Sequence, residues 1–276
     1  MIMEYYAMHS SLNSNIRRII MFNLNTGLYS YLQELGIFSS QWQETLVLIG
    51  LVLVSIVASY FLGSINSAVL ISTVFYKDDI RNHGSGNGGL TNMHRTFGMK
   101  AAGLTLLGDM LKTALAIFIT GTLLGFFYTH GISAYVGFCY MSALFVVLGH
   151  IFPIYYRFKG GKGVLVTAVA ALILTPIPFL ILLAIFIGVV CLSKYISLGS
   201  VSVAVLYPVV VKAYLNVLTF PMDGITALST ILIAILIVWR HWPNLQRISD
   251  RTERKFSFKK KPEVDLVKKD DGGDEN

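Results

Sequence analysis

Long stretches without a charged residue constrain the fold of this chain more than any other feature of its sequence. Residues 45–76 and 163–193 contain no Asp, Glu, Lys or Arg. Residues 101–156 contain only Asp109 and Lys112, and residues 195–239 only Lys212 and Asp223. About 20 apolar residues in a helix cross a bilayer core, and lipid leaves the polar groups of irregular backbone without partners. The stretches lack the alternation of a membrane barrel, so the sequence predicts an all-α polytopic membrane helix bundle.

Glycines, prolines and polar turns divide these stretches into about seven predicted transmembrane helices. An unbroken helix over 163–193 would be about 46 Å long at 1.5 Å per residue, too long for a bilayer without strong tilt. We therefore predict two short helices there, separated by the proline-rich turn 175–178. The other expected helices are 46–75, 101–126, 133–156, 197–219 and 225–239, with turns at 128–131 and 221–224.

The basic residues gather in alternate loops, which predicts how the chain is oriented. The chain carries a formal net charge of +7. Loops 77–100 and 157–162 and the tail after Trp239 hold many of the Lys and Arg residues, whereas the turns 127–132, 175–178 and 220–224 hold none. The positive-inside rule then places these loops and the C-terminus in the cytoplasm and the N-terminus outside. Because the surplus is on one side, we expect no nucleic-acid partner.

The chain is predicted to have one membrane domain with an extension at each end. We expect an N-terminal extension over 1–45, extracytoplasmic by the orientation above, a membrane domain over 46–256 and a disordered cytoplasmic tail over 257–276. The run Ile19–Phe22 is too short for the apolar core of a signal peptide, and an interfacial helix and a floppy extension both fit it. Cys139 and Cys191 lie inside apolar stretches, which favours buried thiols over a disulfide or a metal site.

The first basic loop, residues 79–95, has the composition of an anion-binding loop. Its glycines allow backbone amides to approach an anion closely. Ser85, Thr91 and Asn92 offer neutral hydrogen bonds, and Arg81 and Arg95 offer bidentate pairing to phosphate. The alternative is a flexible glycine loop whose arginines only set topology.

The second basic loop, residues 158–164, places glycines and two lysines before a predicted helix. Such an arrangement cradles anions at the helix N-terminus, although positive-inside charge explains it as well. It is not a nucleotide-binding Walker A loop, because Gly163 stands where that motif has Ser or Thr after the lysine.

Several polar residues are predicted inside or at the ends of the helices. Asp109 and Lys112 are three residues apart, so they share a helix face and can pair or face a substrate. His150 is expected to be a helix-end histidine with a structural hydrogen bond, and Ser197 and Ser200 are candidate helix caps.

Taken together, the motifs resemble those of the bacterial membrane glycerol-3-phosphate acyltransferases that use acyl phosphate as donor. The resemblance covers roughly residues 46–256. It rests on Gly63-Ser64-Ile65, Gly84–Asn87 with Thr91, Asn92 and Arg95, Gly108–Lys112, Gly149–Pro153, Phe158–Val164, Tyr195–Ser200, and His241, Asn244, Arg247 and Glu253. The chain departs from the usual pattern at Asn66, Leu90, Leu165 and Arg251, which leaves substrate preference and full activity open.

The resemblance implies transfer of a fatty acyl group from acyl phosphate to the sn-1 hydroxyl of glycerol 3-phosphate, which gives lysophosphatidic acid for phospholipid biosynthesis. It implies a bacterial plasma membrane, a lipid bilayer around the chain and no cofactor or metal. The implied catalytic residues are Ser85, Asn92, Arg95, Lys162, His241 and Asn244. The implied substrate-binding residues are Gly86, Asn87, Thr91, Asp109, Lys112, Gly160, Gly161, Gly163, Ser197, Ser200, Arg247 and Glu253.

The chemistry left open by the sequence concerns the proton acceptor and the class of protein. No histidine is followed five positions later by an aspartate, which argues against the acyltransferases that use such a pair as base. We expect direct transfer in which the phosphate of the substrate accepts the proton, with His241 as general base the alternative. A transporter of a phosphorylated solute is the competing class, and a purely structural membrane subunit leaves the glycine-rich basic loops unexplained.

Overall fold

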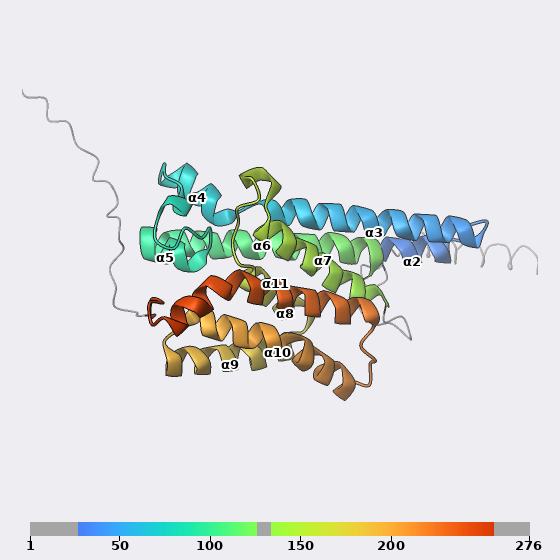
Figure 1. The fold of residues 1–276 in the computed structure, drawn as a ribbon. Helices are drawn as coiled ribbons and strands as arrows, with labels where there is room; N and C mark the ends of the chain where they lie inside the picture. The colour runs from blue at the N-terminus through green and yellow to red at the C-terminus, as the bar shows by residue number, and fades with distance from the viewer. Residues whose placement is uncertain (1–26, 126–133, 257–276) are drawn as a thin grey trace, which may run out of the picture.

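The computed structural model describes residues 27–125 and 134–256, and every α-helix within these ranges contributes to one elongated bundle (Figure 1). Two short 3-10 helices, η1 (Ile80–Asn82) and η2 (Ile154–Tyr156), lie in the loops. The α-helices are α2 (Gly27–Glu34), α3 (Gln41–Ser64), α4 (Ser67–Phe75), α5 (Leu90–Phe97), α6 (Met99–Leu124), α7 (Ala134–Ile151), α8 (Val164–Leu174), α9 (Pro176–Ser193), α10 (Ile196–Val217) and α11 (Gly224–Ser249).

Six of the described helices are long and apolar enough to cross a membrane, namely α3, α6, α7, α9, α10 and α11. The apolar helix α8 has 11 residues and is too short for a full crossing. Large apolar side chains such as Leu192 and Val217 point outward, as expected where lipid covers the surface. The predicted bundle of about seven membrane helices is confirmed when α8 is counted with the six.

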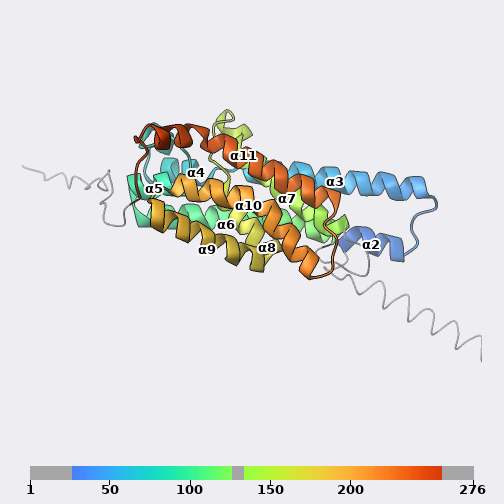
Figure 2. The same cartoon turned by 60° about the horizontal axis from the view of Figure 1, so that its bottom comes forward.

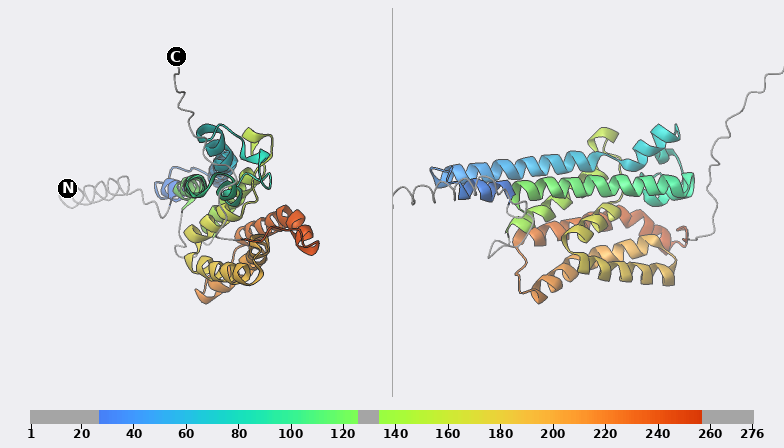
Figure 3. Two further views of the ribbon diagram at one scale, coloured as in Figure 1. Left: turned by 90° about the vertical axis from the view of Figure 1, so that its left-hand side faces the viewer. Right: turned by 180° about the vertical axis from the view of Figure 1, so that it is seen from behind.

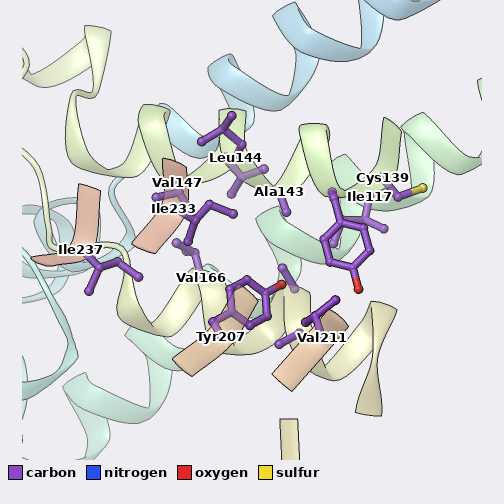
Figure 4. Close-up of a cluster of buried hydrophobic side chains, with 14 of the residues drawn as sticks. Ile117, Cys139, Ala143, Leu144, Val147, Val166, Tyr207, Val211, Ile233 and Ile237 are labelled. Atoms are coloured by element: carbon purple, nitrogen blue, oxygen red, sulfur yellow. The ribbon is translucent and has the colours of Figure 1, made fainter. Parts of the chain in front are cut away.

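The helices form two groups that meet along the length of the bundle (Figures 1 and 2). Helices α3, α6 and α7 pack on one another, and α9, α10 and α11 form the second group. Helix α11 joins the groups by packing on α7, while α8 packs on α6, α7 and α9. The main core lies between the groups and includes Ile117, Tyr140, Val166, Tyr207 and Ile233 (Figure 4).

The loop end of the bundle contains α4, α5 and the C-terminal part of α11 (Figure 3). Helix α2 lies at the opposite end, where the buried ring of Tyr29 packs with Leu124 and Phe138. The two loops singled out in the sequence are therefore at one end of the molecule.

The predicted helix 46–75 is wrong, because Ile65 and Asn66 divide it into α3 and α4. The side chain of Asn66 accepts a hydrogen bond from the Val69 amide (3.1 Å) and so caps α4. It also donates to the carbonyl of Gly88 (3.4 Å), which ties α4 to the first loop. An asparagine in an apolar stretch was the sequence signal for this break.

The predicted ends of several elements also change. The domain boundary at residue 46 falls inside a helix, because α3 begins at Gln41 and α2 packs on α6 before it. The last helix continues ten residues beyond the predicted end at 239, through Pro243 to Ser249. Its apolar pattern stops where the helix leaves the bilayer, although the helix itself continues with polar side chains.

Three predictions lie wholly outside the described residues, namely the interfacial run at 19–22, the turn at 128–131 and the tail 257–276. Of the two cysteines, Cys139 is buried as expected, whereas Cys191 lies exposed on α9. The prediction of a buried thiol is therefore wrong for Cys191. Lipid-facing positions of a membrane helix are apolar without being buried in protein, which is why the two cases look alike in the sequence.

Small residues bring α3 and α7 into close contact. A Cβ atom added to Gly149 would meet the backbone of Tyr60 and Ser64, and one added to Gly63 would meet the backbone of Val146. The hydroxyls of Ser59 and Ser142 lie 2.8 Å apart across the same interface. Small and hydroxyl residues are the usual means of packing helices in lipid.

We predict that Gly149→Ala lowers the free energy of unfolding by about 1–3 kcal/mol, because its methyl group must push apart two backbones. The measurement is the midpoint of thermal unfolding in detergent. Gly50→Ala on the same α3 is the control, since an added Cβ there meets nothing within 4 Å. Equal midpoints for the two variants would contradict the close packing.

Candidate active site

One cavity of about 640 Å³ connects the two loops to the interior of the second helix group. Its loop end is lined by polar residues, including Ser85, Arg95, Lys162, His241 and Glu253. Its other end is lined by apolar residues of α8, α9 and α10, including Ala171, Leu182, Phe186, Ala204 and Tyr207. The cavity is thus amphipathic, with its polar end at the loop end of the bundle.

Asn92 organises the first loop from inside. Its side-chain amide donates to the carbonyls of Ile80 (3.2 Å) and His83 (3.0 Å). Its carbonyl oxygen accepts from the Ser85 amide at 3.1 Å. Gly84 has φ +57° and would place a Cβ against this oxygen, so glycine fits both the backbone and the space. Asn92 holds the loop in shape as well as lining the cavity.

Helix α5 presents Thr91 and Arg95 to the cavity. They are four residues apart and therefore share a helix face, and both line the cavity beside Ser85 and Asn87.

Asp79 fixes the start of the first loop through a salt bridge with Arg81 at 2.6 Å. The hydrogen bond from Arg81 keeps the pKa of the Asp79 carboxyl below its usual value, so this pair stays ionised.

The second loop is held by backbone contacts on both sides. The Gly161 amide donates to the carbonyl of His150 (3.0 Å), and an added Cβ there would meet the His150 ring. Arg240 donates to the carbonyls of Gly160 (3.4 Å) and Gly161 (3.3 Å). Gly163 has φ +86° and precedes α8, so the glycines allow the loop to pack against helix ends.

Lys162 extends from this loop to α11, where its ammonium donates to the side-chain carbonyl of Asn244 (2.6 Å). Burial is the main cause that lowers the pKa of Lys162 to about 8. The carboxylate of Glu253 opposes this shift, and the guanidinium groups of Arg247, Arg240 and Arg95 add to it. The polar end of the cavity gathers Arg95, Lys162 and Arg247 near the Glu253 carboxylate, an arrangement that favours an added anion.

Glu253 joins α10 and α11 at the polar end. Its carboxylate accepts hydrogen bonds from Ser197 (2.8 Å), Asn244 (2.7 Å) and Arg247 (2.8 Å). Burial alone would raise the pKa of Glu253, but these hydrogen bonds outweigh it and lower the pKa. Arg251, just before it, has φ +59°, a conformation that favours glycine. The departure at Arg251 therefore keeps the turn at some cost in backbone strain.

His241 is buried and lines the cavity from α11. Its Nδ1 lies 2.8 Å from the carbonyl oxygen of Ile237. Since a carbonyl only accepts, Nδ1 carries the proton and donates. A neutral His241 ring then has its lone pair on Nε2, which can accept a hydrogen bond or a proton.

Asp109 and Lys112 form the expected ion pair, with Oδ1 and Nζ 2.7 Å apart. Lys112 also donates to the carbonyl of Ile65 (2.8 Å) and lies 3.0 Å from Nδ1 of His150. Ser67 donates to Asp109 (2.9 Å). Asp109 lines the cavity, whereas Lys112 is buried behind it. The contacts of Lys112 are those of a structural group that ties α6 to the break between α3 and α4.

Most of the predicted site residues line this one cavity. They are Ser85, Asn87, Thr91, Asn92, Arg95, Asp109, Lys162, Gly163, Ser197, Ser200, His241, Asn244, Arg247 and Glu253. Gly86 and Gly160 line an adjoining cavity of about 840 Å³. Lys112 and Gly161 are buried and line neither cavity. The predicted caps Ser197 and Ser200 are instead inside α10, which begins at Ile196. The roles of all these residues remain predictions.

Sequence reasoning missed Arg240 as part of the site. It adjoins His241, and its sequence position assigns it only to the basic tail. In the structure its guanidinium donates hydrogen bonds to the carbonyls of the second loop. A charged residue that breaks the apolar pattern inside a helix was the available signal.

The fold and the cavity define a class of protein, a membrane-embedded helix bundle whose amphipathic cavity has basic side chains at one end. The glycerol-3-phosphate acyltransferase family model matches residues 53–251. This chain is a multi-span integral membrane protein and belongs to the glycerol-3-phosphate acyltransferase family.

Relatives and solved structures agree with this assignment. The glycerol-3-phosphate acyltransferase of Listeria monocytogenes is 37% identical over 210 residues, covering 76% of this chain and 98% of the relative. That of Geobacillus kaustophilus is 36% identical over 200 residues, covering 72% and 93%. The crystal structure of PlsY, an integral membrane glycerol 3-phosphate acyltransferase, in its glycerol 3-phosphate form has a TM-score of 0.64 and 29% identity. That match covers 75% of this chain and 96% of the PlsY chain. The lysophosphatidic acid form of PlsY gives a TM-score of 0.62.

We predict that the cavity of the substrate-free protein loses affinity for inorganic phosphate as pH rises through about 8. Lys162 is cationic below its pKa and neutral above it, so the attraction is present at lower pH and is lost at higher pH. The measurement is phosphate-induced thermal stabilisation at a series of pH values, compared between wild type and Lys162→Arg. Arginine stays charged throughout, so the variant keeps its affinity where the wild type loses it.

Lys100→Arg is the matched control, because Lys100 is exposed and does not line the cavity. It retains the wild-type pH profile. Parallel profiles for wild type and Lys162→Arg would contradict the role given to Lys162.

Proposed function

We propose that this family member transfers a fatty acyl group from acyl phosphate to the sn-1 hydroxyl of glycerol 3-phosphate, which yields lysophosphatidic acid and inorganic phosphate. The observation that carries the proposal is the amphipathic cavity of about 640 Å³. Both phosphates fit its polar end and the acyl chain fits its apolar end, so one cavity holds the donor and acceptor together. The names of the relatives and the glycerol 3-phosphate and lysophosphatidic acid forms of PlsY support the same reaction.

The polar end supplies donors of the kinds that phosphate requires. Arg95 and Lys162 provide charge, while Ser85 and Thr91 provide hydroxyls from the first loop and α5. Glu253 orients Asn244 and Ser197 rather than binding phosphate itself, since a carboxylate would repel it. Fixed donors of this kind stabilise the negative charge that develops in the transition state.

The transfer can proceed in one step without an acyl-enzyme. The sn-1 hydroxyl oxygen forms a bond to the acyl carbonyl carbon, and the bond from that carbon to the phosphate oxygen breaks. Phosphate leaves with the bonding electrons, and the hydroxyl proton passes to a phosphate oxygen. Acyl phosphate is a mixed anhydride with a good leaving group, so positioning and charge stabilisation carry much of the catalysis.

The proposal includes the orientation and the membrane. The basic loops, the polar end of the cavity and the C-terminus face the cytoplasm, where glycerol 3-phosphate is dissolved. The N-terminus is outside. The membrane is the bacterial plasma membrane, and the basic loops support this orientation through the positive-inside rule.

The test is an assay with purified protein in detergent, given glycerol 3-phosphate and either acyl phosphate or acyl-CoA. We expect lysophosphatidic acid and phosphate to form only when acyl phosphate is the donor. Release of phosphate is expected to require both substrates. Arg95→Ala lowers kcat/KM by at least about 100-fold, because a charged donor at the transition state is lost. Lys212→Ala, outside the cavity, keeps wild-type turnover.

Two outcomes would overturn the proposal. One is turnover with acyl-CoA but not acyl phosphate. The other is uptake of a phosphorylated solute into vesicles by a protein that forms no product, which would favour a transporter.

His241→Ala separates the two proton acceptors. If the phosphate accepts the proton, His241 only orients the hydroxyl, and we expect a loss of about 10–100-fold, with a measurable residual rate that keeps the wild-type pH dependence. Loss of all turnover with both substrates still bound would assign the general-base role to Nε2 of His241 instead. The measurement is kcat against pH, with substrate binding followed by thermal stabilisation.

A further inference from the structure

We propose that the ring of Tyr207 is the stop that sets acyl-chain length, and the inference rests on the proposed function of the same cavity. Tyr207 lines the cavity from α10 and is only 2% exposed. It lies on the helix face that starts with Ser197 and Ser200 at the polar end. At 1.5 Å per residue, the backbone position of Tyr207 is about 15 Å along α10 from that of Ser197.

On α8, α10 and α11 the lining stops part-way along the helix. It includes Ala171 but not Leu174 on α8, and Ile237 but not Ile233 on α11. On α10 it includes Tyr207 but not Val211, which is four residues further on the same face. Tyr207 is therefore at the last lining position of α10, at the apolar end of the cavity.

Beyond the ring of Tyr207, buried side chains fill the interior. Val211 and Ile233 are both 0% exposed, and they belong with Tyr207 to one cluster of buried side chains (Figure 4). A chain that reaches the ring can extend further only if the ring is absent or displaced. Close packing makes displacement costly.

The walls before the ring are kept open by small residues. Ala204 on α10 and Ala171 on α8 are buried and line the same apolar end. Ala204 is three residues before Tyr207 and so lies on its helix face, nearer to the polar end. Pro208, which follows Tyr207 inside α10, has no amide hydrogen to donate to the Ala204 carbonyl, so one backbone hydrogen bond of the helix is missing at this level.

The bulk of the ring acts as the stop, rather than a hydrogen bond. Within the described part of the chain, the buried hydroxyl of Tyr207 has no hydrogen-bond partner. Tyr207→Phe keeps the ring and removes only this unpaired group, so it serves as the conservative variant.

The experiment gives wild type and variants lauroyl, myristoyl, palmitoyl and stearoyl phosphate with glycerol 3-phosphate and compares kcat/KM. Tyr207→Ala shifts the preference to longer chains by about tenfold for two further methylene groups, because these become buried. Ala204→Leu fills the channel before the ring and shifts the preference to shorter chains. Tyr207→Phe keeps the wild-type preference.

Val211→Ala is the matched control. It empties space on the same helix face, but the ring of Tyr207 separates that space from the cavity, so the preference stays that of wild type. The inference is overturned if Tyr207→Ala and Ala204→Leu keep the wild-type preference, or if Val211→Ala shifts it as much as Tyr207→Ala.

A binding measurement separates failure of this inference from failure of the proposed function. Thermal stabilisation by lysophosphatidic acids of the same chain lengths needs no turnover. If wild type turns over no acyl phosphate but Tyr207→Ala moves the binding optimum to longer chains, the stop is supported and the proposed reaction is wrong. If turnover is present and the optimum is unmoved in both assays, the stop is wrong and the reaction stands.

Discussion

The buried contact between Lys112 and the carbonyl of Ile65 underlies much of this structure. A helix broken inside a membrane leaves polar backbone groups without partners, and lipid offers none. Lys112 satisfies one of them, Asp109 neutralises the lysine, and Ser67 of α4 bonds to Asp109. The same lysine contacts His150, whose carbonyl holds Gly161. One group of charges therefore fixes the break between α3 and α4 and contacts the histidine that holds the second loop. Removing either partner would leave an unpaired charge in the bundle.

A second polar centre, Glu253, performs the corresponding task on the other side of the cavity. It holds Ser197 of α10 and both Asn244 and Arg247 of α11, and through Asn244 it is linked to Lys162. The cations that face the cavity are consequently positioned by neighbours before any substrate arrives. Such preorganisation lowers the cost of ordering donors during reaction.

The sequence predicted what depends on composition and missed what depends on neighbours. The membrane helices and most cavity residues followed from uncharged stretches and from motif spacing. The break at Asn66 was missed because an uncharged asparagine does not interrupt a stretch defined by the absence of charged residues. The length of α11 was missed because its polar last turns lie outside the apolar pattern. Likewise, Asn92 is a plausible phosphate donor by type, yet its bonds to Ile80, His83 and Ser85 appear only when the loop is folded.

The order of the cavity residues along the chain has a consequence for biosynthesis. Ser85 and Arg95 are made early, whereas His241, Asn244 and Glu253 come from the last described helix and the turn after it, more than half the chain later. A nascent chain that has inserted only its first helices holds the glycine loop but lacks the opposite wall. The cavity is therefore complete only after α11 has packed on α7 and α10, and a chain interrupted before that point lacks one of its walls.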